Sequence, residues 1–490
     1  MTRQIRQLGI GLMVCFAILF IQLNRLAVLD AKRLNDNPNN TREILRDFNQ
    51  PRGNVTTADG VVIARSVDSA DSRFELQREY PEGPLYGPIT GFFSFTLGSA
   101  GVEKTYNDEL AGRTLGLSLQ ELGDLFVDKE RVGNLTLTVR DDLQRIAAEG
   151  LGDRQGAVVA LDPRDGSILA MVSNPTYDPN VLADHDTAAA GQAQLAMDAD
   201  PEKPRLARSY QDRFFPGSTF KVVTSTAALK SGTATLDQPV FPSTTGYTPP
   251  LTDRPIRNFG GESCGGNLLE ALRASCNAVF AELGVLSGPE AMIDAAQSFG
   301  FNDRPPIDLT DAARSVFPTD FTRNTPALAQ SAIGQNNVSA TPLQMALVAA
   351  AVANDGVIMK PHVLHDVQDT DGNIVDDYDP DEWRTAMDPG TAGLLREAMF
   401  NVVDRGTATR LDVPGFDVGG KTGTAQLGLD PPRAHAWIIG FAGPEGGEAT
   451  IAIAVLVEGV PEVSSQTGGR IAAPIAQAVL QAYLRDGDAG

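Results

Sequence analysis

The sequence predicts an α+β fold in which a sheet is flanked by helices, and two observations carry this prediction. Strand-like segments open the larger region of the chain at 156–161 and 167–172, and others close it at 415–424, 434–442 and 450–458. Helical patterns fill the interval between these two groups of strands. Because strands and helices are segregated along the chain, the pattern favours an α+β organisation over repeated βαβ units.

The interval contains four predicted helices, and a fifth ends the chain. They are expected at 218–229, 268–285, 342–353, 391–404 and 471–484. The last is mostly apolar and suited to packing on a sheet, and it lacks the basic face of an interfacial membrane helix. Asp371-Gly372 marks a hairpin within the acidic stretch 366–382. Because this stretch lacks the spacing of a calcium loop, we expect the hairpin to be solvated.

A smaller, irregular module precedes this region. Asp59-Gly60 lies between two β-branched runs, which predicts a hairpin at 52–65. Residues 78–112 are rich in proline, glycine and aromatic side chains, and a strand at 135–139 and a helix at 141–150 follow. A chain of 490 residues suits two or three domains. The predicted division is a tail (1–7), an apolar segment (8–29), the small module (30–150) and the larger region (151–490).

The apolar segment predicts a membrane anchor. Arg3 and Arg6 precede an unbroken apolar run at 8–21, and counting on to Leu23 gives a marginal span, since a transmembrane helix needs about 20 residues. A cleaved signal peptide is the alternative, but no small–x–small cleavage site follows the run. We therefore expect an uncleaved single-pass signal anchor in the cell membrane. The basic flank places the N-terminus in the cytoplasm and residues 30–490 outside.

Composition argues against two classes of function. The formal net charge is −22, whereas nucleic-acid binding needs lysines and arginines that neutralise phosphates. The chain holds four His and three Cys, without the spacing of a zinc site. The sequence therefore predicts neither a nucleic-acid partner nor a metal site.

The cysteines leave one question open. Cys15 lies in the apolar segment, and Cys264 and Cys276 are 12 residues apart. Disulfides persist outside the cytoplasm. A Cys264–Cys276 bridge and a pair of free thiols are both compatible with this sequence.

A serine and a lysine stand at a spacing that suits nucleophilic catalysis. Ser218 follows a helix-start signal, and Lys221 lies three residues on, so both are expected on one helix face. A serine hydroxyl becomes a good nucleophile only when a base takes its proton. A lysine amine is such a base when burial or a nearby cation keeps it neutral. Phenylalanines 214, 215 and 220 predict a dry site, and Lys421 is the expected second cation.

Two further polar groups flank Cys276. Ser275 and Asn277 alone would suit an ordinary polar turn or helix cap. Beside a serine–lysine pair, Ser275 is suited to relay a proton between a lysine and a leaving amine. Asn277 is suited to hold Lys221 and to hydrogen-bond a substrate amide.

The segment Lys421-Thr422-Gly423-Thr424 is predicted to lie on an edge strand beside these groups. Lys421 is expected to contribute positive charge for a substrate carboxylate and Thr422 a hydroxyl. Gly423 is expected to let a substrate approach the backbone, since it has no Cβ. The amides of Ser218 and Thr424 are expected to form an oxyanion hole, in which one donor is typically worth about 3–4 kcal/mol.

Serine–x–x–lysine, serine–x–asparagine and lysine–threonine–glycine, in this order, are the signature of β-lactamases and penicillin-binding proteins. The chain resembles the class B penicillin-binding proteins over nearly its whole length, from anchor through pedestal (30–150) to transpeptidase domain (151–490). Segments 160–180, 341–346 and 436–443 are similar to further family segments. The Asn-rich stretch after the anchor and the overall size are most similar to the penicillin-binding protein A type of actinobacteria.

The resemblance implies a peptidoglycan D,D-transpeptidase with an antiparallel sheet. Ser218 would attack the D-Ala-D-Ala carbonyl of a stem peptide and form an acyl-enzyme, from which an amine of a neighbouring stem makes the cross-link. Penicillin would acylate the same serine. No metal or organic cofactor is implied. The implied partners are stem peptides, β-lactams, the membrane, a membrane glycan polymerase and other wall-synthesis proteins.

Several alternatives share these motifs. A β-lactamase or a D,D-carboxypeptidase would hydrolyse the acyl-enzyme, a β-lactam sensor would need a longer membrane part, and a scaffold of the wall-synthesis complex would not need intact motifs. Two departures from the family pattern are expected to reshape the cleft floor. Gly334-Gln335-Asn336-Asn337 stands where many members have Gly-Gln-Gly, and Cys276 fills the second motif. Residues 30–135 are too few for the glycosyltransferase domain of bifunctional members.

Overall fold

The structure is a computed structural model that describes residues 2–25, 48–70, 74–114, 132–429, 432–461, 463 and 466–487. The end of the predicted apolar segment, 26–29, and the polar connection that follows it, 30–47, lie outside these residues. Helix α1 (Thr2–Asn24) contains the predicted apolar run. None of the helices in the described ranges is long and apolar enough to cross a membrane.

The larger region is built on a five-stranded sheet in which every neighbouring pair is antiparallel. The order β17-β18-β19-β7-β8 brings strands from both ends of the region together. The strands are β7 (Gly156–Leu161), β8 (Ile168–Asn174), β17 (Phe416–Leu429), β18 (Pro432–Pro444) and β19 (Ile451–Val457). Every residue of β7 and β19 is buried. Because successive side chains point to opposite faces of a sheet, both faces must be covered.

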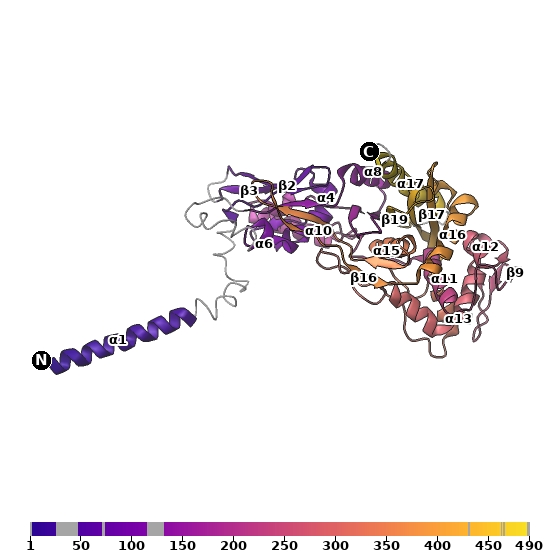
Figure 1. Cartoon of the computed structure of the whole chain (residues 1–490), viewed down its shortest axis with the longest axis horizontal. Helices are drawn as coiled ribbons and strands as arrows, with labels where there is room; N and C mark the ends of the chain where they lie inside the picture. Colours follow the sequence, from indigo (N-terminus) through magenta and orange to yellow (C-terminus); the bar gives the residue numbers. More distant parts are fainter. Residues whose placement is uncertain are drawn as a thin grey trace.

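Three helices provide much of this cover. α15 (Pro342–Ala353) contacts β7, β18 and β19 and lies beside β19 in Figure 1. α8 (Asp141–Leu151) and α17 (Gly468–Gly487) contact each other and the sheet. α15 begins at a cap in which Thr341 Oγ1 accepts a hydrogen bond from Gln344 N at 3.0 Å, and it is buried almost throughout. This burial explains why its sequence is apolar on all sides.

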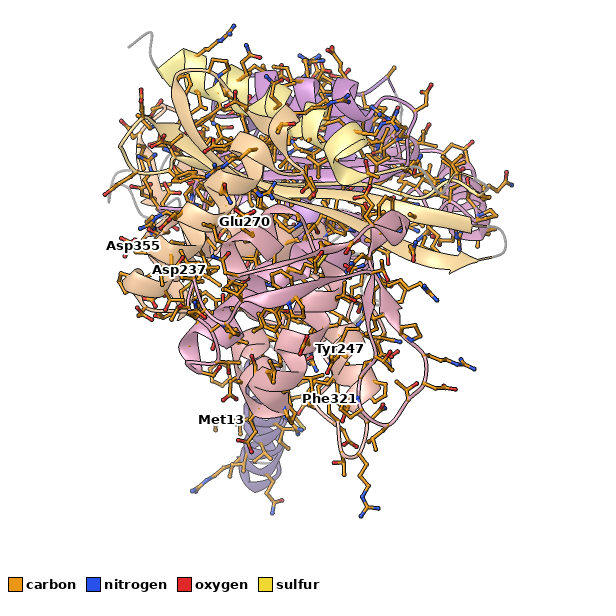
Figure 2. All side chains as sticks on the ribbon, turned by 90° about the vertical axis from the view of Figure 1, so that its right-hand side faces the viewer. Met13, Asp237, Tyr247, Glu270, Phe321 and Asp355 are labelled. Carbon is orange, nitrogen blue, oxygen red and sulfur yellow. A yellow bond between two sulfur atoms is a disulfide. The ribbon has the colours of Figure 1, made fainter. Side chains whose placement is uncertain are left out.

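A second group of helices lies at one end of the molecule, on the right of Figure 1. It includes α11 (Lys221–Lys230), α12 (Leu268–Arg273) and α13 (Asn277–Ser298), with α14 (Thr325–Ser331) and α16 (Pro389–Arg405). α11 contacts α13 and α16, and α16 contacts β17, so this group is joined to the edge of the sheet. Figure 2 turns this end towards the viewer, with Glu270 of α12 above Tyr247 of β10 (Gly246–Tyr247).

The pedestal contains a second sheet, and two strands from the larger region, β14 and β15, extend it. Its order is β15-β14-β6-β1-β2-β3. The strands are β1 (Val55–Thr56), β2 (Val62–Asp68), β3 (Leu76–Glu79), β6 (Asn134–Leu137), β14 (Leu364–Gln368) and β15 (Ile374–Asp377). The predicted hairpin at Asp59-Gly60 is confirmed by the antiparallel pairing of β1 with β2.

The prediction of a solvated hairpin at 366–382 was wrong for its first strand. β14 pairs with β6 of the pedestal, and Asp366 and Val367 are buried in that contact. Thr136 Oγ1 donates to Asp366 Oδ1 at 3.0 Å, which satisfies the buried carboxylate. The acidic composition had suggested exposure to solvent, but an acidic side chain can be buried where neighbouring groups donate hydrogen bonds to its carboxylate. The chain therefore returns to the pedestal after entering the larger region.

Short elements connect these layers. In the pedestal and beside it they are α4 (Gly83–Thr90), β4 (Phe93–Ser94), β5 (Gly98–Ser99), α5 (Gly101–Thr105), α6 (Asn107–Leu110), α9 (Asn180–Ala183) and α10 (Thr187–Ala199). Around the second helical group they are η3 (Gly217–Phe220), β9 (Phe241–Thr244), β11 (Ile256–Arg257), η4 (Phe259–Gly261), β12 (Cys264–Gly266), β13 (Val357–Met359), β16 (Glu382–Thr385) and η5 (Thr409–Leu411).

The prediction of one helix over 268–285 was wrong, because the helix breaks in the middle. α12 ends at Arg273 and α13 begins at Asn277. Ser275 between them has a φ of +56°, which no helix interior permits. The apolar period runs on across the break, so periodicity alone did not reveal it.

A buried ion cluster stabilises the pedestal. Glu103 is fully buried between two arginines, with Arg52 Nε 2.5 Å from its Oε2 and Arg78 Nε 2.6 Å from its Oε1. Burial alone would raise the pKa of Glu103, but the two guanidinium groups outweigh it and lower the pKa below its usual value of 4.5. The carboxylate is therefore the charge that allows two arginines to be buried together.

Glu103→Gln is expected to lower the free energy of unfolding by about 3–5 kcal/mol, because it leaves two buried cations without a counter-charge. Urea denaturation of the purified protein measures this. Glu79→Gln is the matched control, since Glu79 pairs with Arg65 at 2.7 Å on the exposed surface and such pairs are worth about 0–1 kcal/mol. Equal losses for the two variants would contradict the prediction.

Candidate active site

The residues of the three motifs meet at one cleft. It has a volume of about 980 Å³, and its walls include Ser218, Ser275, Asn277, Thr422 and Thr424. Ser218 comes from η3, the asparagine from the first turn of α13, and the threonines from β17. Segments more than 200 residues apart in sequence are thus brought together, as the resemblance to the penicillin-binding proteins implies.

Ser218 lies on a 3₁₀ turn rather than within a regular α-helix. η3 spans Gly217–Phe220, and α11 begins at Lys221. In a 3₁₀ turn the side chains at positions i and i+3 are eclipsed. Lys221 is the residue that follows η3, three positions after Ser218, so the two side chains are expected on the same side of this turn.

A close contact between two glycines fixes the turn that carries Ser218. Gly217 N donates to Gly334 O at 3.0 Å, and both residues have positive φ. A Cβ on Gly334 would lie 2.2 Å from Gly217 O, so no larger residue fits there. The side chains that follow, Gln335 and Asn336, line the cleft. The departure from the family's Gly-Gln-Gly pattern thus borders the cleft, and its expected reshaping of the cleft floor stays a prediction.

Lys221 is fully buried and is held by the second motif. Its Nζ donates to Ser275 O at 2.7 Å and to Asn277 Oδ1 at 2.7 Å, and lies 3.3 Å from Ser275 Oγ. Burial lowers the pKa of Lys221 well below its usual value, and the charge of Lys421 lowers it further. Three acceptors thus surround the amine, and a neutral lysine held among them keeps one lone pair with which it can accept a proton.

The dry neighbourhood of Lys221 differs from the predicted one. Phe280 is the ring beside Nζ, with 5.4 Å between the nitrogen and the ring centroid. Phe220 stacks on Phe317 instead, and Phe214 packs edge-on against His435. Phe280 lies on α13, four residues after Cys276, so helix packing supplies the apolar contact.

Lys421 is also fully buried, which changes its expected role. Its Nζ donates to Ser275 Oγ and to Thr422 O, each at 2.8 Å. Burial lowers the pKa of Lys421 to about 7. Ser275 lines the cleft and Lys421 lies behind it, joined to it by a hydrogen bond. In this position the amine does not lie on the cleft surface, where a substrate carboxylate would bind. The exposed cations of the cleft wall are Arg257, Arg410 and Arg470.

Ser275 connects the two lysines. Its Oγ accepts from Lys421 at 2.8 Å and lies 3.3 Å from Lys221 Nζ. Its positive φ is unusual for a residue other than glycine, and a strained backbone of this kind typically costs about 1–3 kcal/mol. The strain aims the main-chain carbonyl of Ser275 at Lys221 while its hydroxyl stays beside Lys421. Ser275 is therefore placed to pass a proton between the two amines.

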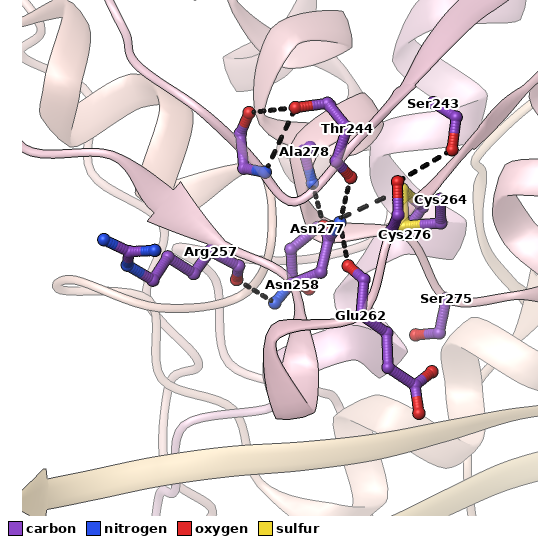
Figure 3. Close-up of a disulfide and its surroundings, with 12 residues drawn as sticks. Ser243, Thr244, Arg257, Asn258, Glu262, Cys264, Ser275, Cys276, Asn277 and Ala278 are labelled. Carbon is purple, nitrogen blue, oxygen red and sulfur yellow. Dashed lines mark hydrogen bonds between the residues drawn. A yellow bond between two sulfur atoms is a disulfide. The ribbon is translucent and has the colours of Figure 1, made fainter.

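The residue after Ser275 is held by a disulfide. Cys276 is bonded to Cys264 of β12, so the question left open by the sequence is answered in favour of a bridge. Figure 3 shows this disulfide beside the turn that carries Ser275 and Asn277. Cys15, the third cysteine, is free.

β17 carries the third motif along the cleft. Within this motif, the space beside Gly423 is not used as predicted. A Cβ on Gly423 would lie 2.9 Å from Thr219 Cγ2 and 3.0 Å from Pro216 O. The glycine therefore allows η3 to pack against β17, and its missing side chain does not face the cleft. Thr422 faces the cleft, where its hydroxyl lies 2.5 Å from that of Thr407.

The predicted oxyanion hole requires Ser218 and Thr424 to be neighbours. Both line the cleft, and a Cβ on Gly217 would lie 3.0 Å from Thr424 O. Trp437 Nε1 donates to Phe215 O at 3.0 Å and ties the start of this turn to β18. The turn with the nucleophile thus rests directly on the strand with the third motif. The direction of the two amides stays a prediction.

Several residues of the site were not predicted. Asn258, Thr407 and Trp437 support or line it from outside the three motifs. Asn258 and Thr407 carried no signal in the sequence, and Trp437 lay in the family-like segment 436–443 without an expected role. The exposed arginines likewise lie on unrelated segments and do not form a basic run.

Two family matches cover most of the chain. Residues 156–481 match the penicillin binding protein transpeptidase domain, and residues 52–135 match the penicillin binding protein A dimerisation domain. The chain is 37% identical to the peptidoglycan D,D-transpeptidase PbpA of Mycolicibacterium smegmatis, over 99% of this chain and 100% of the relative. It is 34% identical to the PbpA of Mycobacterium tuberculosis, over 99% of both chains.

Solved structures agree with these matches. The ceftriaxone acyl-enzyme complex of penicillin-binding protein A from M. tuberculosis superposes with a TM-score of 0.82 at 34% identity, covering 89% of this chain and 99% of that one. A D,D-transpeptidase domain from Eggerthella lenta gives a TM-score of 0.77 at 32% identity, covering 90% of this chain and 100% of that one. These matches and likenesses show that the chain belongs to the penicillin-binding protein transpeptidase family.

Proposed function

We propose that this chain is a peptidoglycan D,D-transpeptidase of cell-wall synthesis and that Ser218 is its nucleophile. One observation carries the assignment of roles. Lys221, one 3₁₀ turn from Ser218, is a fully buried amine held by Ser275 and Asn277, and its burial and the charge of Lys421 favour the neutral form, which has a lone pair. A neutral amine of this kind is the base that a serine nucleophile needs.

In the first step Ser218 Oγ attacks the carbonyl carbon between the two D-alanines, and Lys221 takes the hydroxyl proton. The bond from Oγ to the carbonyl carbon forms, and the oxyanion is stabilised by the amides of Ser218 and Thr424. The C–N bond then breaks, and the leaving amine of D-alanine receives a proton through Ser275. Lys421, with a pKa of about 7, is suited to exchange that proton near neutral pH.

In the second step an amine of a neighbouring stem peptide attacks the acyl-enzyme. Lys221, which has by then passed the serine proton through Ser275 to the departing D-alanine, takes a proton from this amine. The new amide C–N bond forms, the bond from the acyl carbon to Ser218 Oγ breaks, and Lys221 returns the proton to Oγ. The substrate carboxylate needs a cation that reaches the cleft. Arg410 and Arg470 are suited to this, because both are exposed on the cleft wall that carries Thr422. No cofactor is part of this sequence of steps.

The purified chain tests this function when it is incubated with a stem pentapeptide donor and an amine acceptor. We expect a cross-linked peptide and one released D-alanine per cross-link. With benzylpenicillin we expect an adduct that persists for hours. A β-lactamase or carboxypeptidase would instead lose the acyl group to water quickly and give hydrolysed product without cross-links. A folded protein with neither product would support the scaffold alternative.

The rate constant for acylation by benzylpenicillin is expected to fall on the acid side, as the pH decreases through the pKa of Lys221. Protonation removes the lone pair that accepts the serine proton. Lys421→Met removes a positive charge that lowers this pKa. The acid limb of the pH profile is therefore expected to move to higher pH in the variant. An unchanged limb, or a shift to lower pH, would contradict the coupling of the two lysines.

We further propose that the N-terminal segment anchors the protein in the cell membrane, with the cleft outside. What supports this is the basic flank and the exposed apolar side chains of α1, including Phe16, Leu19 and Phe20. We expect the full chain to stay in the membrane fraction after an alkaline wash. Protease added to intact spheroplasts is expected to digest residues 30–490. Release by the wash, or protection from protease, would contradict this location.

The pedestal is the proposed docking site for a membrane glycan polymerase. The supporting feature is β15, the edge strand of the pedestal sheet, where Ile374 is 60% exposed. A photo-crosslinking residue at position 374 is expected to trap the polymerase in cells. The same residue at position 195, where Leu195 is exposed on α10, is the control. Equal trapping at both positions, or none at 374, would contradict the proposal.

A further inference from the structure

The start of α13 lacks the cap that its own sequence would normally provide. Cys276 is the N-cap residue and makes no side-chain capping bond. Its sulfur is bonded to Cys264. The first N–H groups of a helix need acceptors from outside its own turn. For α13 this matters directly, because Asn277 is the first residue of the helix.

Asn258 supplies the missing cap from another segment. Its Oδ1 accepts from Ala278 N at 2.9 Å, the position that an N-cap side chain serves. Its Nδ2 donates to Thr244 O at 2.7 Å and to Glu262 O at 2.9 Å. Asn258 is buried, and these bonds fix its amide in one orientation. Figure 3 shows Asn258 at the centre of this network.

The preceding residue fixes the side chain of Asn277. Arg257 O accepts from Asn277 Nδ2 at 3.0 Å. This bond turns Asn277 Oδ1 towards Lys221 Nζ, 2.7 Å away. The two residues 257 and 258 thus hold Asn277 in two ways, by the cap on the next amide and by the bond to the side chain.

The neighbouring turn needs such support. Ser275 has a positive φ, and backbone conformations of this kind persist where surrounding contacts over-determine them. The disulfide holds the turn at Cys276, and the cap at Ala278 holds it two residues later. Between these two points lies Asn277, which touches the catalytic lysine.

We propose that Asn258 is a positioning residue for Ser218 acylation, because it caps α13 in trans and thereby holds Asn277 against Lys221. This inference rests on the proposed function of Ser218. Asn258 borders the cleft, but its side-chain amide bonds Thr244 O, Glu262 O and Ala278 N and neither Lys221 nor Ser218, so its proposed effect passes through the start of α13.

The test compares Asn258→Ala with Asn258→Asp. The aspartate keeps an oxygen for Ala278 N and loses both donors to the loop, whereas alanine loses all three bonds. The measured quantities are the second-order rate constant for acylation by fluorescent penicillin, the final labelled fraction and the melting temperature. We expect the alanine variant to be labelled completely but about tenfold more slowly, the scale of one or two capping bonds. The aspartate variant is expected to be clearly faster than alanine even where its melting temperature falls equally.

Asn180→Ala is the matched control. Asn180 also bonds a main-chain N–H and a carbonyl, those of Tyr80 at 2.9 and 2.8 Å, but on the pedestal side. Its acylation rate is expected to match that of the wild type. A wild-type rate in Asn258→Ala overturns the proposal, as does equal slowing in the alanine and aspartate variants or in the Asn180 control. An unlabelled wild type would instead refute the function of Ser218.

Discussion

Ser218→Ala is expected to give no covalent adduct with fluorescent penicillin and no cross-linked peptide. The variant removes the only oxygen proposed to form a bond to substrate, and loss of a serine nucleophile typically costs about 10⁶ in kcat. Ser218 is partly exposed on the cleft wall, so alanine leaves no unpaired buried group. The fold should therefore survive. Gel fluorescence after a long incubation, together with circular dichroism, measures both outcomes.

Ser231→Ala is the control for this loss. Ser231 follows the same helix, α11, and its hydroxyl bonds only neighbouring groups, at 3.3 Å to Ala228 O and 2.8 Å to the Thr233 hydroxyl. Its adduct should form at the wild-type rate. A stable adduct on folded Ser218→Ala protein would show that another residue is acylated.

Lys221→Met is expected to slow acylation by about 10²–10⁴-fold, the usual range for loss of a general base. Methionine has a similar length and suits the dry site beside Phe280. It leaves Asn277 Oδ1 and Ser275 O without their donor, so some loss of stability is also expected. The penicillin acylation rate of the folded fraction, measured by stopped assays over hours, separates the two effects.

Lys230→Met tests whether the loss of any positive charge from α11 is enough to slow acylation. Lys230 ends the same helix and donates to Ala386 O at 3.0 Å, away from the cleft. Its acylation rate should stay within a factor of a few of the wild type. If Lys221→Met were acylated as fast as this control, Lys221 would not be the base.

The sequence predicted the parts of the fold that depend on local patterns. The helix at 342–353 and the strand at 156–161 appear with the predicted bounds, because one is apolar except for Gln344 and the other is a short apolar run with two valines. The family resemblance that the three motifs carry also implied that they meet at one cleft. The placement of β14 was missed, since its partner β6 lies some 230 residues earlier and pairing at that distance leaves no local pattern.

The sequence identified the residues of the site more accurately than it predicted what each of them does. Lys421 was expected to face a carboxylate, but burial and two hydrogen bonds turn it towards Ser275. Gly423 was expected to let a substrate approach the backbone, but the space left by its missing Cβ is taken by the side chain of Thr219. Asn258 was not predicted at all. Each of these outcomes depends on which neighbours the fold supplies, and a motif does not contain that information.

The burial of the two lysines also has a consequence for folding. In the unfolded chain Lys421 has its ordinary pKa of 10.5, whereas in the folded protein the value is about 7. Unfolding at neutral pH therefore takes up protons, and the free energy of unfolding should rise as the pH increases from about 7 to 10.5. The ionisation of Lys421 thus opposes folding most strongly at and below about pH 7, and this opposition has disappeared above about pH 10.5. The packing of the sheet and helices must therefore outweigh the free-energy cost of burying this lysine.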